Sequence, residues 1–281
     1  MSHMQMTTKE RVLCVLKYLF LALCVFVALF PIIWVIMSSF KTNAEILSNG
    51  VALPKTPSLT GYRNALTISP ILNYFGHSII ITTVSTVLNV LFLAMAAYVF
   101  ARCRFRGRDV LYFILSLAMV IPMTALLHPV YSVIQALGLY DTKTGLILVY
   151  TALNLPMSLL ILRGTFLSIP RALEEAAYVD GAGFVRTFFQ IMLPCAKGGL
   201  TSAAVLAFLQ SWNEFTFALV LTSGQDARTL PLSLSYFTAQ FSFDYPAMFA
   251  AVTIAVIPSI IVFAVFQEQV VSSLTAGSVK E

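Results

Sequence analysis

The stretch Ser168-Ile-Pro-Arg-Ala-Leu-Glu-Glu-Ala-Ala-Tyr-Val-Asp-Gly-Ala-Gly183 is a polar interval between two strongly apolar runs. Pro170 suits the first turn of a helix. Gly181 can adopt the left-handed conformation that commonly ends one. The interval therefore predicts a short helix that presents the carboxylates of Glu174 and Glu175, followed by a sharp turn. We interpret it as a docking device for something outside the apolar part of the protein.

A second, amphipathic helix is predicted directly after this turn. Phe184, Phe188, Ile191 and Met192 recur at the spacing of one helical face, and Pro194 follows them. We expect this helix to end at Pro194, to lie under a membrane, and to lead into the next apolar run.

The composition places the chain in a lipid bilayer. Hydrophobic residues make up 59% of its 281 residues and charged residues only 10%, whereas charged residues are about a quarter of a soluble domain. A spanning helix needs roughly 20 mostly apolar residues. The sequence therefore predicts one all-α integral membrane domain over residues 1–281. Its six expected spans are residues 18–37, 79–101, 110–127, 146–162, 201–221 and 246–266.

The distribution of positive charge predicts the orientation. Lys and Arg in short flanking loops are enriched on the cytoplasmic side of a membrane. One side collects Lys9, Arg11, Lys17, Arg102, Arg104, Arg106, Arg108, Arg163, Arg171, Arg186, Lys197 and Lys280. The other collects Lys41, Lys55, Arg63, Lys143 and Arg228. Both termini and the loop at 168–197 are therefore expected in the cytoplasm, with the arginines of residues 102–108 meeting anionic lipid head groups.

The sequence lacks the usual signatures of catalysis. No phosphate-binding G-x-x-x-x-G-K-[ST] loop is present, and no Ser/His/Asp, Cys/His or paired-carboxylate arrangement occurs in the loops. His77 and His128 are interpreted as interfacial or helix-capping groups, and no metal site is expected. We predict that the chain itself is not an enzyme and binds no nucleic acid.

The polar interval resembles the permease signature of bacterial ATP-binding cassette importers, E-A-A-x3-G-x9-I-x-L-P. Every spacing matches in Glu175-Ala176-Ala177, Gly181, Ile191 and Leu193-Pro194. The extended form with Asp180 and Ala182 is similar to the carbohydrate-uptake branch, as is Ser211-Trp212-Asn213-Glu214-Phe215. The resemblance covers essentially the whole chain and looks closest to the smaller permease subunit of maltose-type transporters.

This resemblance implies a type I importer fold in a bacterial cytoplasmic membrane. The expected partners are a second homologous permease subunit, two cytoplasmic ATPase subunits that bind ATP and Mg, and an extracytoplasmic sugar-binding protein. Carried over by residue, Glu175 contacts the ATPase, Ala176 and Ala177 allow close approach, and Gly181 makes the turn. Asp180 belongs to the extended motif, and the role of Glu174, grouped with this coupling loop, stays open.

A layer of polar side chains is predicted near the middle of the bilayer. Its members are Asn89, Asn154, Gln210, Asn213 and Glu214. Sugars are recognised by polar groups with aromatic faces alongside, and Trp212 adjoins this layer, so we hypothesise that the layer borders a translocation path. The alternative is that the amides hydrogen-bond between helices, which stabilises a membrane protein by about 0.6–2 kcal/mol per bond.

The third external loop is the expected contact with the binding protein, through Gly224, Gln225 and Asp226. The alternative there is an ordinary linker. For the whole chain, the competing function is a proton-coupled secondary carrier that titrates Glu214, since ionisable groups inside a bilayer are costly and usually functional. That carrier predicts transport that collapses with the proton gradient while ATP remains.

Overall fold

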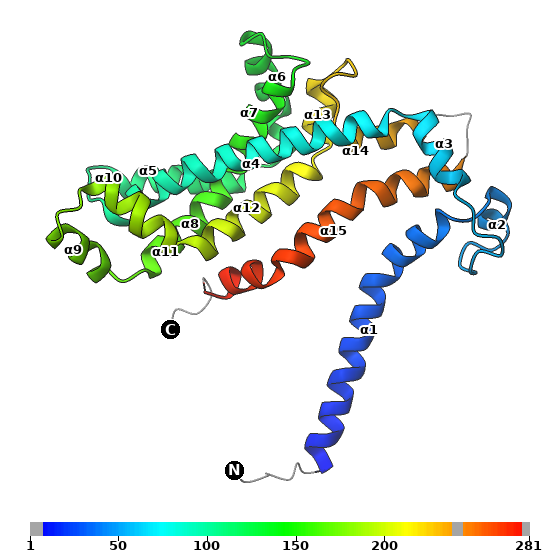
Figure 1. Cartoon of the computed structure of the whole chain (residues 1–281), viewed down its shortest axis with the longest axis horizontal. Coiled ribbons are helices and arrows are strands. Elements are labelled where there is room, and N and C mark those ends of the chain that lie inside the picture. The colour runs from blue at the N-terminus through cyan, green and yellow to red at the C-terminus, as the bar shows by residue number, and fades with distance from the viewer. Residues whose placement is uncertain (1–7, 238–243, 277–281) are drawn as a thin grey trace. The chain divides into compact units, whose positions relative to one another are not determined.

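The computed structural model describes residues 8–237 and 244–276, and every regular element in these ranges is a helix (Figure 1). Lys280, one of the cytoplasmic charges above, lies outside the described residues. The helices are α1 (Thr8–Ser38), α2 (Asn43–Ser48), α3 (Thr60–Ile68), α4 (Ile71–Arg102), α5 (Arg108–Leu117), α6 (Leu127–Ala136), α7 (Lys143–Leu153), α8 (Leu155–Ser168), α9 (Ala172–Val179), α10 (Phe184–Thr187), α11 (Leu193–Cys195), α12 (Lys197–Trp212), α13 (Thr216–Leu221), α14 (Leu230–Ser233) and α15 (Tyr245–Ala276). Short 3-10 turns follow α5 and α14 and precede α6, and a π turn (Phe188–Met192) separates α10 from α11.

The chain divides into two compact units. The N-terminal unit comprises Met1–Ser69 and Phe237–Ile254, and the core unit comprises Pro70–Tyr236 and Ala255–Glu281. Within the N-terminal unit, the segment after α1 is bonded to the start of α15. Asn64 donates to the carboxylate of Asp244 at 2.6 Å. Gly61 lies so close to Pro246 that a Cβ there would be 2.8 Å from the proline carbonyl oxygen.

Three helices, α1, α4 and α15, are long and apolar enough to cross a membrane. Three bent pairs qualify as one further span each: Arg108–Val120 with Met123–Ala136 at 103°, Lys143–Leu153 with Leu155–Ser168 at 48°, and Phe184–Cys195 with Lys197–Trp212 at 75°. The all-α membrane fold class is thus confirmed, and the described helices provide three to six spans.

Three of the predicted spans are not continuous helices. The run at 110–127 breaks before Pro122, where Ile121 is extended with ψ of 122°, as expected for a residue that precedes proline. The run at 146–162 bends at Asn154. The run at 201–221 stops at Trp212 and resumes at Thr216 as α13. Hydropathy alone does not reveal these breaks, because a window long enough to detect a span averages the few polar residues around them with their apolar neighbours.

The core unit is organised around α4, which contacts α7, α8, α12 and α14. The buried side of α4 combines large side chains, such as Tyr74 and Tyr98, with small or weakly polar ones. The small ones include Ser78, Thr82, Ser85, Ala94, Ala97 and Ala101. Small side chains allow helix backbones to approach closely in a membrane, where van der Waals contact drives association.

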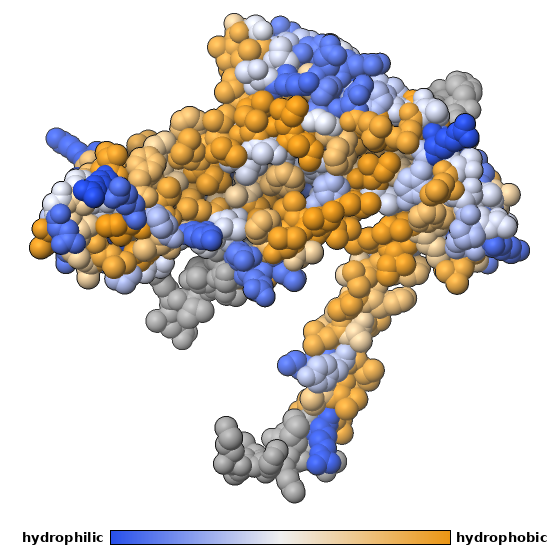
Figure 2. Space-filling model, in the orientation of Figure 1, coloured by the Kyte–Doolittle hydropathy of each residue, from blue (hydrophilic) through white to orange (hydrophobic). Residues whose placement is uncertain are grey.

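Large apolar side chains face outward, as a bilayer requires. On α1, Phe20 and Phe26 are 64% and 62% exposed. Figure 2 shows hydrophobic residues over most of the visible surface of α1 and along the flank of the core unit. Exposed apolar surface on this scale marks contact with lipid or with partner proteins.

Candidate functional site: the α9 loop and a half-open cavity beside α13

The turn after α9 adopts the predicted left-handed conformation. Gly181 has φ of +79°. Its amide donates to the carbonyl of Tyr178 at 3.1 Å, and the amide of Ala182 donates to the carbonyl of Ala177 at 2.9 Å. These two bonds are the Schellman pattern, which satisfies the last carbonyls of a helix. They fix the direction in which the chain leaves α9.

The coupling residues divide between two faces of α9. Glu174 and Ala177 are buried, with exposed fractions of 8% and 4%. Glu175, Ala176 and Asp180 are exposed. Residues three apart lie on the same side of a helix, so 174 and 177 face the protein together. The sequence predicted that both carboxylates project, and the structure corrects this for Glu174.

The carboxylate of Glu174 forms an ion pair with Arg102, the last residue of α4. The Arg102 Nε to Glu174 Oε2 distance is 3.4 Å, and the two side chains are 6% and 11% exposed. The Arg102 guanidinium also donates to the carbonyl oxygen of Ile169. We had expected Arg102 to meet lipid head groups, but its side chain is buried against α9. The exposed Arg104 and Arg106 remain available for lipid.

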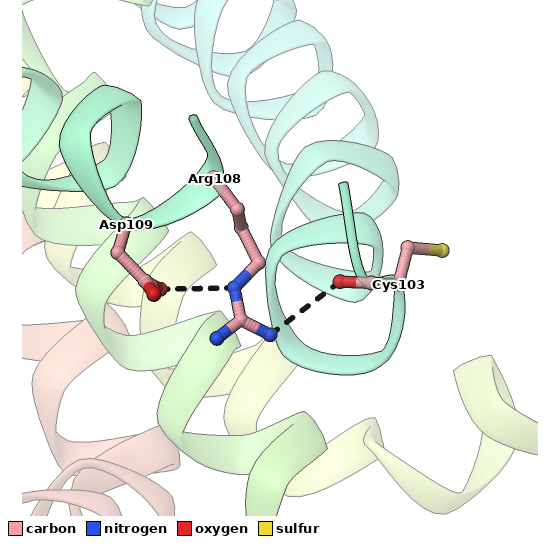
Figure 3. Close-up of polar contacts among 3 residues, drawn as sticks. All are labelled: Cys103, Arg108 and Asp109. Atoms are coloured by element: carbon pink, nitrogen blue, oxygen red, sulfur yellow. Dashed lines mark hydrogen bonds and ion pairs between the residues drawn. The ribbon is translucent and has the colours of Figure 1, made fainter. Parts of the chain in front are cut away.

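In the arginine-rich turn between α4 and α5, Arg108 makes two side-chain contacts. Its guanidinium pairs with Asp109 at 2.9 Å and donates to the carbonyl of Cys103 at 3.5 Å (Figure 3). Gly107, with φ of +84°, makes the turn into α5. The loop between α4 and α5 is therefore closed by its own side chains rather than by α9.

A cluster of aromatic rings packs between α4 and the segment that follows α9. The ring of Tyr98 on α4 lies 5.4 Å from Phe166, 5.2 Å from Phe184 and 5.1 Å from Phe188, measured between centroids. These rings come from α4, α8, α10 and the π turn. Aromatic pairs at such distances add packing energy beyond the burial of area, so α4 and the segment after α9 pack as one body.

The predicted amphipathic helix is irregular. It does not end at Pro194, because the chain stays helical to Cys195 and then bends by 75°. Proline has no amide hydrogen to donate to the carbonyl four residues earlier, and its ring crowds that carbonyl. The π turn directly before α11 accommodates this clash. Phe188 and Met192 are buried as expected, whereas Phe184 is 42% exposed.

A cavity of about 270 Å³ brings together four of the five midplane residues. Its lining includes Tyr150, Asn154, Gln210, Ser211, Asn213 and Glu214. Asn154 donates to the Ser211 hydroxyl at 3.0 Å and is thereby oriented. Asn89 does not line the cavity. It is fully buried and donates to the Thr151 carbonyl at 2.9 Å, which joins α4 to α7.

Glu214 caps α13. Its carboxylate accepts hydrogen bonds from the amides of Phe217 and Ala218, at 2.7 and 3.0 Å, and from the Tyr150 hydroxyl at 2.8 Å. Those amides belong to the first turn of a helix and otherwise lack partners. The sequence offered no signal for this cap, since the break between α12 and α13 was not predicted.

A second carboxylate, Asp141, holds the third external loop. It lies between α6 and α7 with φ of +58°. Its oxygens accept from the amides of Ser223 and Gly224, at 2.9 and 3.0 Å, and from the Ser223 hydroxyl at 3.1 Å. Partial burial raises the pKa of Asp141, but these donors outweigh it and hold the pKa below its ordinary value. Gly224 is thus an internal contact, while Gln225 and Asp226 are exposed.

The same loop is bonded to the N-terminal end of α4. The amide of Leu230 donates to the Ser78 hydroxyl at 2.7 Å. His77 Nδ1 lies 3.2 Å from the carbonyl oxygen of Arg228. Tyr74 and Tyr236 share a hydroxyl–hydroxyl bond of 3.0 Å. His77 therefore contacts the backbone of this loop, and its interfacial position stays a prediction.

Comparisons with known proteins agree with this architecture. A family described as "Binding-protein-dependent transport system inner membrane component" matches residues 93–275. The diacetylchitobiose uptake system permease protein NgcG of Streptomyces coelicolor is 36% identical, over 96% of this chain and 90% of the relative. The sulfoquinovosyl glycerol transport system permease protein SmoH of Agrobacterium fabrum is 36% identical, over 90% of this chain and 89% of the relative.

A solved structure shares the fold. It is the crystal structure of a bacterial ABC transporter involved in the import of the acidic polysaccharide alginate. The likeness has a TM-score of 0.82 and 24% identity, and covers 94% of this chain and 98% of that one. At this identity the match supports the fold and carries no inference about substrate.

Proposed function

The chain belongs to the family of binding-protein-dependent transport system inner membrane components, and we propose that it is a permease subunit of an ATP-driven carbohydrate importer. Two relatives are named for diacetylchitobiose and for sulfoquinovosyl glycerol, both of which are glycosides. Within such an importer the chain forms half of the translocation path. It catalyses no covalent step, and ATP is hydrolysed by a partner subunit.

The exposed face of α9 is the observation that supports coupling to an ATPase. Glu175 and Ala176 lie on that face, and Val179 at the end of α9 is 88% exposed. Together with the exposed Leu173 and Tyr178, this residue gives α9 an apolar surface beside a carboxylate, which suits contact with another protein. The positive-inside rule places this face in the cytoplasm, where ATP is available.

The cavity beside α13 is the proposed point at which this subunit meets the sugar. Gln210 and Asn213 line it together with Phe215. Amides and an aromatic ring are the groups that hydrogen-bond and stack against a sugar. Asn89 is assigned instead to helix packing, because it is fully buried away from the cavity and its amide nitrogen donates to the Thr151 carbonyl.

On the external side, Gln225 and Asp226 are the proposed contacts with a solute-binding protein. Both are exposed, and the neighbouring Gly224 is fixed by Asp141. The loop is therefore fixed at Gly224 and exposed at the next two residues. This arrangement favours a defined protein contact over a flexible linker.

The alternative function, a proton-coupled carrier that titrates Glu214, is less well supported. Glu214 is held by two backbone amides and a hydroxyl, so its carboxylate has a structural task at the start of α13. Family membership also points to delivery of solute by a binding protein rather than to ion coupling.

Co-purification tests the proposal. The chain is tagged and produced in the cells it comes from, and the proteins that remain bound to it in detergent are identified. We expect a second permease and an ATPase, and we expect Glu175→Ala to weaken retention of the ATPase. Asp109→Ala is the matched control, because Asp109 is an exposed carboxylate in the first turn of α5, outside the α9 loop. A stable complex without any ATPase contradicts the proposal.

A further inference from the structure

The core unit contains one long helix that joins the two loops assigned to partners. α4 is a single helix of 32 residues without an internal proline, which corresponds to about 48 Å at 1.5 Å per residue. Figure 1 shows α9 and α10 near its C-terminal end and α14 near its N-terminal end. The neighbouring pairs α5 with α6 and α7 with α8 are bent. A continuous helix transmits displacement along its axis better than a bent pair.

At its C-terminal end, α4 is fixed to α9 by a buried ion pair. Arg102 reaches both the carboxylate of Glu174 and the carbonyl of Ile169. These acceptors belong to α9 and to the segment that enters it. A guanidinium presents several donors in a rigid plane, so it holds both acceptors in one geometry. The pair lies off the face proposed for the ATPase, since Glu174 is buried and Glu175 is exposed.

At its N-terminal end, α4 is fixed to the third external loop. The Ser78 hydroxyl accepts from the Leu230 amide, and the Tyr74 hydroxyl bonds that of Tyr236. Ser78 is 2% exposed and Tyr74 is fully buried. The Arg228 guanidinium also lies 3.4 Å from the Tyr236 hydroxyl. The loop that would meet the binding protein therefore moves with the first turns of α4.

We propose that α4 is the element that transmits displacement between the external loop and α9, and that Arg102 and Glu174 are the positioning residues that make α9 move with it. The inference rests on the coupling role proposed above for the α9 loop. Breaking a buried pair leaves one charge without its partner, which is strongly unfavourable. The pair therefore resists separation whenever α4 or α9 is displaced.

The experiment compares three states of the pair in the assembled importer in proteoliposomes. The variants are Glu174→Gln, Arg102→Gln, and the charge exchange that combines Glu174→Arg with Arg102→Glu. The readout is the ratio of ATP hydrolysis with sugar-loaded binding protein to hydrolysis without it. ATPase retained on the permease is measured on the same samples.

We expect each single variant to keep the ATPase bound while the stimulation ratio falls at least fivefold. The charge exchange should recover part of the lost stimulation, because it restores the ion pair while the bond to the Ile169 carbonyl stays broken. ATPase retention on the same samples separates this effect from a failure to assemble. Ser78→Ala, at the other end of α4, should lower the same ratio without altering ATPase retention. It provides the test if the variants of the buried pair fail to assemble.

Two outcomes overturn the inference. One is a wild-type stimulation ratio in both single variants while the ATPase stays bound. The other is a loss of ATPase retention in Glu174→Gln as large as in Glu175→Ala, which would make Glu174 a docking residue. A wild-type result for Glu175→Ala itself would instead contradict the proposed coupling loop, so the two failures are distinguishable.

Discussion

Glu174 and Glu175 are adjacent in the chain, but the first is on the buried side of α9 and the second is on its exposed side. The first is 8% exposed and paired with Arg102, whereas the second is exposed. Two neighbouring carboxylates thus divide into an inward anchor and an outward contact. The division gives each residue a different expected phenotype.

Gly181→Ala tests the turn that directs the chain out of α9. Alanine at φ of +79° costs about 1 kcal/mol because its Cβ crowds the backbone in the left-handed region. Transport should fall and the ATPase should be retained less well, although no atom lies within 4 Å of the added methyl. Gly183→Ala is the control, since Gly183 has φ of −73° and equally open surroundings. Equal effects of the two substitutions would contradict the role of the left-handed turn at Gly181.

Asp141→Asn tests the anchor of the external loop through pH. Asparagine tolerates positive φ, so the change removes the charge without added strain. Since the folded pKa of Asp141 is lowered, its ionised form stabilises the protein above the ordinary aspartate pKa of about 3.9. That stabilisation is lost as the pH falls through the folded value.

The purified variant should therefore melt a few degrees below wild type at pH 7, roughly 2–4 °C by the usual scaling. The difference should shrink below about pH 4. Thermal unfolding across pH 3–7 measures it, with Asp226→Asn, an exposed neighbour, as control. A difference that is independent of pH would contradict the assigned hydrogen bonds.

Glu214→Gln separates the cap from a proton-carrying role. Loss of the charge at the start of α13 should destabilise the protein by about 1 kcal/mol. ATP-driven uptake should persist when a protonophore collapses the proton gradient, in both wild type and variant. Uptake that stops with the gradient while ATP remains would restore the proton-carrier alternative.

Asn89 and Gln210 are predicted to respond differently to alanine. Asn89→Ala should lower stability by about 0.6–2 kcal/mol through loss of its bond to the Thr151 carbonyl, with the sugar concentration for half-maximal uptake unchanged. Gln210→Ala should raise that concentration with little effect on melting, because Gln210 lines the cavity. The reversed pattern would place the sugar against Asn89 instead.

The sequence indicated the α9 loop well because its signals are local. Gly181 makes the turn that its motif position predicts, and hydropathy located the apolar runs. The sequence could not predict which carboxylate of α9 faces the protein. The partner of Glu174 is Arg102, which is distant in the chain. Hydropathy windows also average over breaks such as that at Asn154, where Pro156, in the first turn of α8, cannot donate to the preceding helical turn.

Asp141 and Tyr150 were missed for a related reason. Each acts on a residue far along the chain: Asp141 on Ser223 and Gly224, and Tyr150 on Glu214. An aspartate in a polar loop and a tyrosine in an apolar run are common, so neither position stands out by composition. Such pairings become visible only once the helices are assembled.

ATP-driven uptake in proteoliposomes tests the central claim most directly. The chain is reconstituted with its partner permease, ATPase and binding protein, and accumulation of a labelled glycoside is followed with ATP and no ion gradient. We predict accumulation by wild type and by Asp109→Ala, and at least a tenfold lower rate for Glu175→Ala at equal membrane insertion. Equal rates for wild type and Glu175→Ala, or accumulation that requires an ion gradient in place of ATP, would contradict the account.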